Sequence, residues 1–278
     1  MPAYETPQPI SVTIDLVIGD VRVAAAPRTD TDVEVRPSDP RRPADVAAAE
    51  RTRVEHTRGA LRVRGPRQRG FGKAGSVAVT IALPAGSAVR GAAGVADLRA
   101  TGRLGACRFT TSVGDIRLEE TGPLDVSSSA GDISVDRVRG RAEATTGTGD
   151  VRICEVAGPA IVKNRNGDSW LGEVTGDLRL SAANGALTVG KAHRAVDART
   201  ANGDIRIGEV VRGSVVLDTT SGRLDVGIGS GTAALLDVSS RAGSVHNFMT
   251  AADGPGTSDD TVEVHACTRA GDVAIHRA

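Results

Sequence analysis

A glycine recurs at every eighteenth position through the middle of the chain, and this interval constrains the fold more than any other feature of the sequence. The glycines that keep the interval are Gly131, Gly149, Gly167, Gly185 and Gly203. Aspartate follows four of these five glycines. A fixed period of this length is typical of proteins in which each repeat is a small unit that stacks on its neighbours.

Inward positions alternate with outward ones in every repeat. Before the glycine the inward pairs are Leu124/Val126, Ala142/Ala144, Ala160/Val162, Leu178/Leu180 and Val196/Ala198. After the glycine they are Ile133/Val135, Val151/Ile153, Ser169/Leu171, Leu187/Val189 and Ile205/Ile207. Alternation with a period of two predicts short strands with one buried face, whereas a helix needs apolar spacings of three and four. One such hairpin cannot bury its own apolar face, so the sequence predicts an all-β fold, a β-solenoid with about 18 residues and two short strands per coil.

The turns between the strands fit the same fold. Asn166, Asn184 and Asn202 each precede a glycine of the repeat. Asn-Gly is a common pair in tight connections between strands, because both residues tolerate a positive φ. Stacked at the repeat interval, the three asparagine side chains are also expected to bond to one another as a ladder.

The 278 residues are expected to form a single elongated β domain, with an irregular N-terminal β region over residues 1–88 and solenoid repeats over residues 89–278. In the N-terminal region, residues 10–23 are expected to form one coil that turns at Gly19-Asp20. Residues 53–64 alternate around Gly59 as a β-hairpin would, and the alanine-rich residues 44–50 predict one or two helical turns. The segment from Arg64 to Lys73, which carries Arg64, Arg67, Arg69 and Lys73, is expected to be a solvated loop, with a basic docking loop as the alternative.

Composition narrows the functional classes. Lys and Arg together number 34, as do Asp and Glu, so the formal net charge is zero and a general nucleic-acid binder is disfavoured. Residues 1–10 lack the pattern of a secretory signal, and no apolar stretch is long enough to span a membrane. The three cysteines, an odd number at wide spacing, favour free thiols in a reducing cytoplasm. The expected location is therefore cytoplasmic.

Four segments are similar to a known family. They are Gly131–Val135, Val162–Asp168, Thr200–Val210 and Gly231–Val238. In these segments the chain resembles the β-strand-repeat proteins grouped as domain of unknown function 4097 and labelled "putative adhesin". The resemblance covers nearly the whole chain and implies a β-solenoid, no known catalytic residue and, through the label, a role in adhesion.

The residues that could bind a ligand or take part in catalysis are more simply explained by structural roles. The recurring aspartates Asp115, Asp132, Asp150 and Asp168 suggest a calcium site. Calcium-binding repeats, however, carry more glycines and more acidic ligands in every turn than the single Gly-Asp pair found here. A turn role for these aspartates is therefore favoured. Residues 227–236 superficially resemble a dinucleotide-binding loop but lack the βαβ unit that such a loop needs. The five histidines show no metal-ligand spacing, and Cys107 is expected in the core. We therefore expect no catalytic residue, no metal and no cofactor.

Trp170 occupies an outward position that other coils fill with Arg152, Thr188 and Arg206. A tryptophan there is expected to stack on a neighbouring guanidinium. The alternative is a contact site for a partner, formed by Trp170, Arg152 and Arg206.

Two functional hypotheses follow from these observations. The first is a non-enzymatic scaffold or assembly protein of the cytoplasm that uses the solenoid as a rigid surface. The alternative is a ligand-binding module, adhesin-like or part of a cell-envelope stress response, that recognises a partner on one solenoid face. An enzyme such as a solenoid polysaccharide lyase would need clustered carboxylates and basic residues in a cleft, and the repeat columns do not suggest one.

The sequence also predicts how the chain associates. The strand pair around Val273 and Ile275 is expected to end the solenoid with an open edge. Either the insertion at residues 251–260 covers this C-terminal edge, or a second copy pairs with it and forms a homo-oligomer. We expect pairing with a second copy, because the insertion is short and polar.

Overall fold

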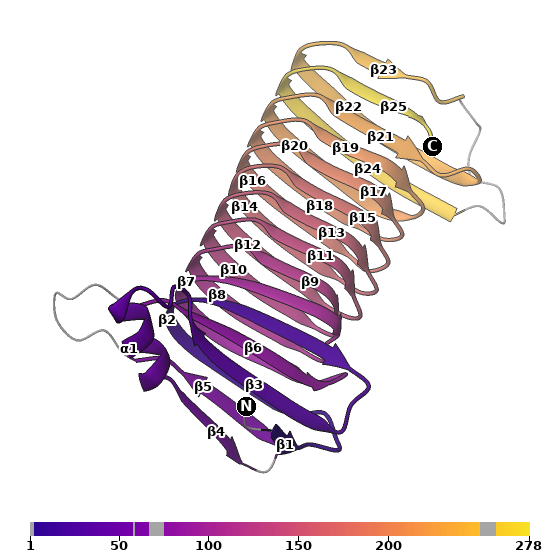
Figure 1. The fold of residues 1–278 in the computed structure, drawn as a ribbon. Coiled ribbons are helices and arrows are strands. Elements are labelled where there is room, and N and C mark those ends of the chain that lie inside the picture. The colour runs from indigo at the N-terminus through magenta and orange to yellow at the C-terminus, as the bar shows by residue number, and fades with distance from the viewer. Residues whose placement is uncertain (1–2, 58, 67–74, 251–259) are drawn as a thin grey trace. The chain divides into compact units, whose positions relative to one another are not determined.

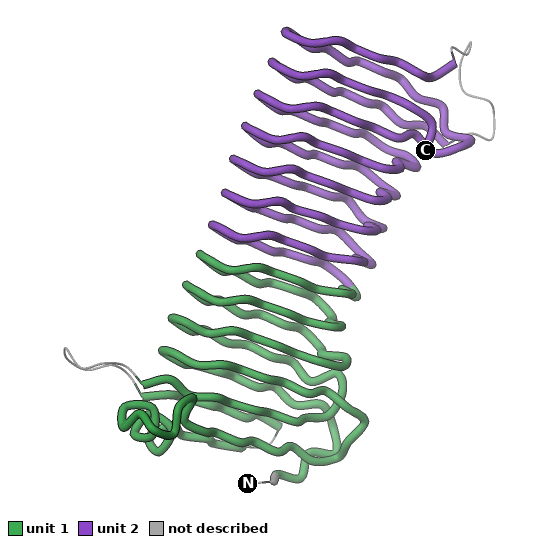
Figure 2. The backbone as a smooth tube through the Cα atoms, turned by 45° about the horizontal axis from the view of Figure 1, so that its top comes forward, with its two compact units in different colours: residues 1–139 green, residues 140–278 purple. Residues whose placement is uncertain are grey.

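The computed structural model describes residues 3–57, 59–66, 75–250 and 260–278. These residues fold almost entirely into strands, with one helix among them (Figure 1). The chain divides into two compact units, residues 1–139 and 140–278 (Figure 2). Within each unit, strands of successive coils pair in parallel and in register, so the β-solenoid prediction is confirmed.

Unit 1 begins around two long strands. These are β2 (Ser11–Ala26) and β7 (Ala88–Arg103), which pair in parallel along most of their length. On the other edge of β2, β5 (Ala60–Arg64) pairs with its first part and β6 (Val77–Pro84) with its second. One long strand of the N-terminal region therefore serves as the template for two shorter ones.

The prediction that residues 10–23 form a coil with a turn at Gly19-Asp20 is wrong, because β2 runs through both residues without a break. Gly19 serves a close approach between strands instead. A Cβ atom at this position would lie 2.5 Å from the carbonyl oxygen of Val77 on β6. A Gly-Asp pair therefore indicates a turn only where the alternation of apolar residues also stops on either side of it.

Antiparallel strands and the helix close the N-terminal end of unit 1. β4 (Arg53–Thr57) pairs antiparallel with β5 as the predicted hairpin. β3 (Asp30–Pro37) pairs antiparallel with β6, and β1 (Ala3–Glu5) with β3. The helix α1 (Pro43–Arg51) confirms the expected helical turns, with proline in its first turn, where a missing N–H costs nothing. The basic residues Arg67, Arg69 and Lys73 lie outside the described residues.

Regular coils follow in unit 1. Their strands are β8 (Cys107–Val113), β9 (Ile116–Thr121), β10 (Leu124–Ala130) and β11 (Ile133–Val138). β8 pairs with β7 and β10, and β9 pairs with β7 and β11, all in parallel. The ring of Phe109 fits into this core because its neighbour on β7 is Gly91, where a Cβ atom would lie 2.7 Å from the ring.

Unit 2 continues the pattern with two parallel sheets. One sheet contains β12 (Ala142–Thr148), β14 (Ala160–Asn166), β16 (Leu178–Asn184), β18 (Val196–Asn202) and β20 (Gly213–Ser221). The other contains β13 (Val151–Val156), β15 (Ser169–Val174), β17 (Leu187–Ala192), β19 (Ile205–Val210) and β21 (Leu224–Ile228). Ile153, Leu171, Val189 and Ile207 are successive register partners, and each side chain is fully buried. The predicted inner columns are therefore correct in register and in face.

The asparagine ladder is also present. The Asn184 side-chain amide donates to Asn166 Oδ1 at 2.8 Å, and the Asn202 amide donates to Asn184 Oδ1 at 2.9 Å. The glycine after Asn184 has a φ of +140°, and a Cβ atom on it would lie 2.0 Å from the carbonyl oxygen of Gly167 in the adjacent coil. The turn therefore requires glycine both for its backbone conformation and for its close stacking.

The last coils of unit 2 do not stack in sequence order. Their strands are β22 (Thr232–Ala242), β23 (Val245–Asn247), β24 (Asp260–Ala270) and β25 (Val273–Arg277). β24 pairs with both β20 and β22, and β25 pairs with both β21 and β23. The coil that comes last in the sequence thus lies between two earlier ones, and Figure 1 shows β23 beyond the yellow β25.

This order corrects the predicted position of the open end. Val273 and Ile275 are fully buried between coils, so they do not form an uncovered edge. Within the described residues, the outermost coil of unit 2 is formed by β22 and β23. The insertion that was weighed as a cover, residues 251–259, lies outside the described residues.

Candidate functional site

The predicted contact residues lie on the outer face of the second sheet of unit 2. Arg152 and Trp170 are register partners on β13 and β15, and the guanidinium carbon of Arg152 lies 4.0 Å from the centroid of the Trp170 ring. Arg206 is not part of this pair. It lies two coils beyond Trp170, with Thr188 between them, and its Nε is 3.7 Å from Asp225 Oδ2. The structure therefore brings together two of the three predicted residues.

A column of glycines lies beside Trp170 that the sequence analysis missed. Its members are Gly172, Gly190, Gly208 and Gly227. A Cβ atom on any of them would lie within 2.6 Å of a carbonyl oxygen of the preceding coil. Their spacing in the sequence could have revealed them, since three of the four keep the 18-residue interval. Because glycine has no side chain, these positions place no side chain beside the Arg152–Trp170 pair.

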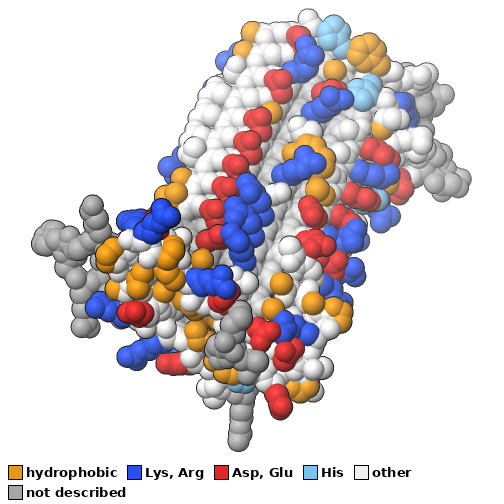
Figure 3. Space-filling model, in the orientation of Figure 1, with side chains coloured by type: hydrophobic (Ala, Val, Ile, Leu, Met, Phe, Trp, Pro, Cys, Tyr) orange, Lys and Arg blue, Asp and Glu red, His pale blue; other side chains and the backbone are white. Residues whose placement is uncertain are grey.

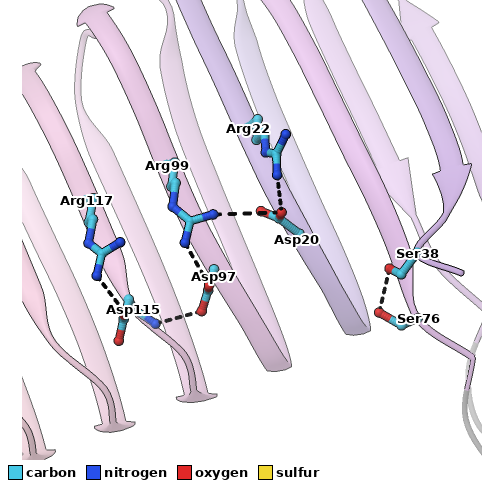
Figure 4. Close-up of polar contacts among 8 residues, drawn as sticks. All are labelled: Asp20, Arg22, Ser38, Ser76, Asp97, Arg99, Asp115 and Arg117. Carbon is cyan, nitrogen blue, oxygen red and sulfur yellow. Dashed lines mark hydrogen bonds and ion pairs between the residues drawn. The ribbon is translucent and has the colours of Figure 1, made fainter.

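The aspartate column holds the turns together. In unit 1, Asp97 Oδ1 accepts the backbone N–H of Asp115 at 3.0 Å, and Asp115 Oδ1 accepts that of Asp132 at 3.0 Å. The other oxygens of Asp97 and Asp115 accept from Arg99 and Arg117, as Figure 4 shows. Unit 2 repeats the contact, because Asp168 donates its backbone N–H to Asp150 Oδ1 at 2.9 Å.

These contacts occupy the carboxylates. The turn role that the sequence favoured for the aspartates is therefore observed directly. No group of three or more His, Cys, Asp or Glu side chains suited to a metal ion occurs in the part of the chain that the structure describes.

A second polar column, inside the solenoid, was also missed. Its members donate a side-chain hydrogen bond to the carbonyl oxygen of a turn glycine in the neighbouring coil. They include Ser128, Asn164, Thr200, Thr219, Ser240 and Thr268. In unit 2 the column is interrupted at Ala182, the register partner of Asn164. Asn164 compensates for the donor that Ala182 lacks. Its amide donates both to Gly149 O at 3.0 Å and to Gly167 O at 2.9 Å, the carbonyl oxygen that a polar residue at position 182 would reach.

The surroundings of Cys107 and His265 raise the pKa of both side chains. Burial raises the pKa of the Cys107 thiol to about 12, which keeps it protonated in the core. Cys154 is half-buried and Cys267 exposed, and all three are free. His265 lies 3.2 Å from Asp237 and 3.0 Å from Glu263, and these carboxylates raise the pKa of the imidazole.

A groove crosses the outer face of the first sheet of unit 2. Its volume is about 360 Å³, and its apolar lining includes Pro159, Ile161 and Val216. Arg179 and Asp197 form an ion pair at 3.5 Å, and this pair lies between Ile161 and Val216 in one row of register partners. A second hollow of about 580 Å³ shares the lining residues Asp177 and Ala195 with the first. On the face toward the viewer, Figure 3 shows acidic side chains in a row along the stacked strands, with basic side chains beside them.

The outermost coil of unit 2 exposes both backbone and apolar side chains. β24 is the only partner of β22 among the described residues, and β25 is the only partner of β23. Val245 occupies an inner column, in register with the buried Val273, yet it is 43% exposed. Leu235 and Phe248 are 67% and 69% exposed. Among the residues that the structure describes, this coil combines an edge with no further strand paired to it and the end of the apolar core, and we call it the open coil.

No helix in the described part of the chain is long and apolar enough to cross a membrane.

The parallel coils, the stacked turns and the inward columns define a protein of the β-solenoid repeat class. The family model described as Toastrack DUF4097 matches residues 11–277, and the chain therefore belongs to this family. None of the curated proteins matches it.

Several solved structures are similar in fold. A "putative adhesin" from Parabacteroides merdae is 14% identical, with a TM-score of 0.50, over 81% of this chain and 94% of that one. A "putative adhesin" from Bacteroides fragilis is 12% identical, with a TM-score of 0.37, over 100% of this chain and 95% of that one. At these identities the likeness concerns the fold alone.

Proposed function

We propose that this chain is a non-enzymatic scaffold or assembly protein of the cytoplasm, whose stacked coils provide a rigid surface and whose open coil joins it to further subunits. The observation that carries the proposal is the open coil itself. A strand edge with unpaired N–H and C=O groups, next to exposed apolar side chains, is a template for another strand. Natural proteins usually protect such an edge with charges, prolines or a covering segment.

Three further observations support the proposal. The carboxylates of Asp97, Asp115 and Asp150 accept hydrogen bonds from turn amides, which gives them a structural role. The three cysteines are free, as expected for a reducing compartment. The parallel sheets, whose coils are joined by strand pairing and by the asparagine ladder, also present a surface that is expected to change shape little on binding.

The test compares two exposed valines. Val245→Lys places a charge on the open coil, whereas Val113→Lys places one on β8 of unit 1, where the valine is similarly exposed at 48%. In cytoplasmic extracts of the native host, the wild-type chain and Val113→Lys are expected in particles larger than the single chain of 28.5 kDa. Val245→Lys is expected at the mass of the single chain, as measured by native size fractionation. Particles that keep their size in Val245→Lys would contradict the proposal.

A second candidate function is an adhesin-like or cell-envelope stress module that binds a ligand on one solenoid face. The observations that favour it are the stacked Arg152–Trp170 pair and the apolar groove with Ile161 and Val216. The Parabacteroides merdae structure of similar fold is described as a "putative adhesin", which agrees with this alternative. A chain recovered outside the cell, with binding lost in Trp170→Ala and retained in Val245→Lys, would favour it over the scaffold.

A further inference from the structure

The outer face of the last strands of unit 2 carries its charges in two separate groups. In the first group, His265 on β24 lies between Glu263 on the same strand and Asp237 on β22. In the second group, Arg241 on β22 lies beside Arg269 on β24, since the residues flanking both are register partners. The open coil is therefore acidic in the middle of β22 and basic towards its end.

The two arginines lack a counter-charge within the described residues. No ion pair involves Arg241 or Arg269 there, and the strand pairing places the two cations side by side on one face. Like charges on directly paired residues of adjacent strands destabilise a sheet. An acidic side chain approaching from beyond the edge of β22 would remove this repulsion.

From this charge pattern we infer that β22 pairs antiparallel with β22 of a second copy, about a two-fold axis at Ser239. In this register Asp237 of each copy faces Arg241 of the other. The same register keeps inner residues opposite inner residues, with Val238 facing Ser240, so the apolar columns of both copies meet at the interface. The inference rests on the proposed assembly function and names its partner, a second copy of this chain.

The described strands of unit 1 disfavour a filament. Head-to-tail growth would need an edge in unit 1 that complements the parallel strands of the open coil. Unit 1 instead carries antiparallel strands with β1 and β4 as edges among the described residues, and β4 exposes Arg53 and Glu55. Charged edge strands of this kind resist further pairing. A closed dimer through the open coil is the arrangement that uses one edge and leaves the other protected.

Charge exchange tests the register. Light scattering is expected to give the intact chain at tens of micromolar a mass of about twice 28.5 kDa. Asp237→Arg alone and Arg241→Asp alone each place like charges across the axis, and each is expected at the mass of one chain. An equal mixture of the two variants restores both opposite-charge pairs, so it is expected to return to the mass of two chains. Asp218→Arg, on β20 away from the open coil, is the matched control and is expected to remain a dimer.

The mixture separates this contact from any effect within one chain. Asp237→Arg also removes the neighbour of His265, and mixing cannot restore that internal contact, so recovery can arise only across the interface. A monomeric intact chain, or single variants that remain dimeric, would overturn the inference. If the pure chain is monomeric but its cellular particles still depend on Val245, the inference fails and the proposed assembly function stands.

Discussion

Leu171→Ala is expected to lower the free energy of unfolding by about 2–5 kcal/mol, the cost of a cavity in a packed core. Leu171 is fully buried between Ile153 and Val189 of the neighbouring coils. A rigid stack of this kind cannot collapse around the lost methyl groups without separating strands on both sides. Ile153→Ala is expected to behave in the same way.

Denaturant titration followed by far-ultraviolet circular dichroism measures this loss. Ser181→Ala, at an exposed position on β16, is the control and is expected to change the free energy by no more than about 0.5 kcal/mol. A loss no larger than the control at both Leu171 and Ile153 would mean that the register is displaced by one residue, because such a displacement exchanges the two faces of a strand.

Asn164→Thr is expected to cost about 1–3 kcal/mol, because it leaves a buried carbonyl oxygen without a donor. A threonine at this position can reach Gly149 O, as the equivalent Thr200 reaches Gly185 O, but not Gly167 O as well. Ala182→Thr would supply the missing donor to Gly167 from the next coil.

The double variant therefore provides the test. Ala182→Thr is expected to recover most of the loss in the Asn164→Thr background and to add little to the wild-type chain, as measured by thermal and denaturant unfolding. Two residues that share one acceptor should show such a coupling in a double-mutant cycle. Strictly additive effects would show that Asn164 does not compensate for the alanine.

The inward columns and the asparagine ladder could be predicted from the sequence because each depends on the repeat interval alone. Two residues separated by 18 positions share a column whatever else the chain does. The turn role of the aspartates could also be predicted, because it depends on the local chemistry of an aspartate that follows a glycine. The polar column of Thr200 and its equivalents was missed because threonine also fits an exposed strand position, so its burial leaves no clear mark on the sequence.

The order of the last coils could not be derived from the interval. The inner residues of β22 and of β24 fit the same columns, so the periodicity does not say which strand lies against β20. One residue carried the missing information. Asn247 stands in the column of the buried Ile275, and a polar residue at an inner position is tolerated best in the outermost coil, where the column meets water.

The contact residues show the same division. The stacking of Arg152 on Trp170 followed from a single outward column. The charge groups of the open coil combine residues on β22 and β24, which become neighbours only through the unexpected insertion of the last coil. The sequence alone therefore located the Arg152–Trp170 contact, which joins successive coils. It did not locate the charge groups of β22 and β24, whose coils are not stacked in sequence order.

A cysteine on the proposed axis tests the central claim most directly. In a Cys267→Ser background, which removes the thiol paired in register with residue 239, Ser239→Cys would face its own copy across the axis. Directly opposed residues in antiparallel strands have Cα atoms about 4.5–5.5 Å apart, within the range of a disulfide. Mild oxidation at low protein concentration is expected to give a covalent dimer of about twice 28.5 kDa under denaturing, non-reducing conditions, whereas Ser181→Cys in the same background is expected to form no covalent dimer. Failure of Ser239→Cys to cross-link, or equal cross-linking at the control position, would contradict a dimer formed through the open coil.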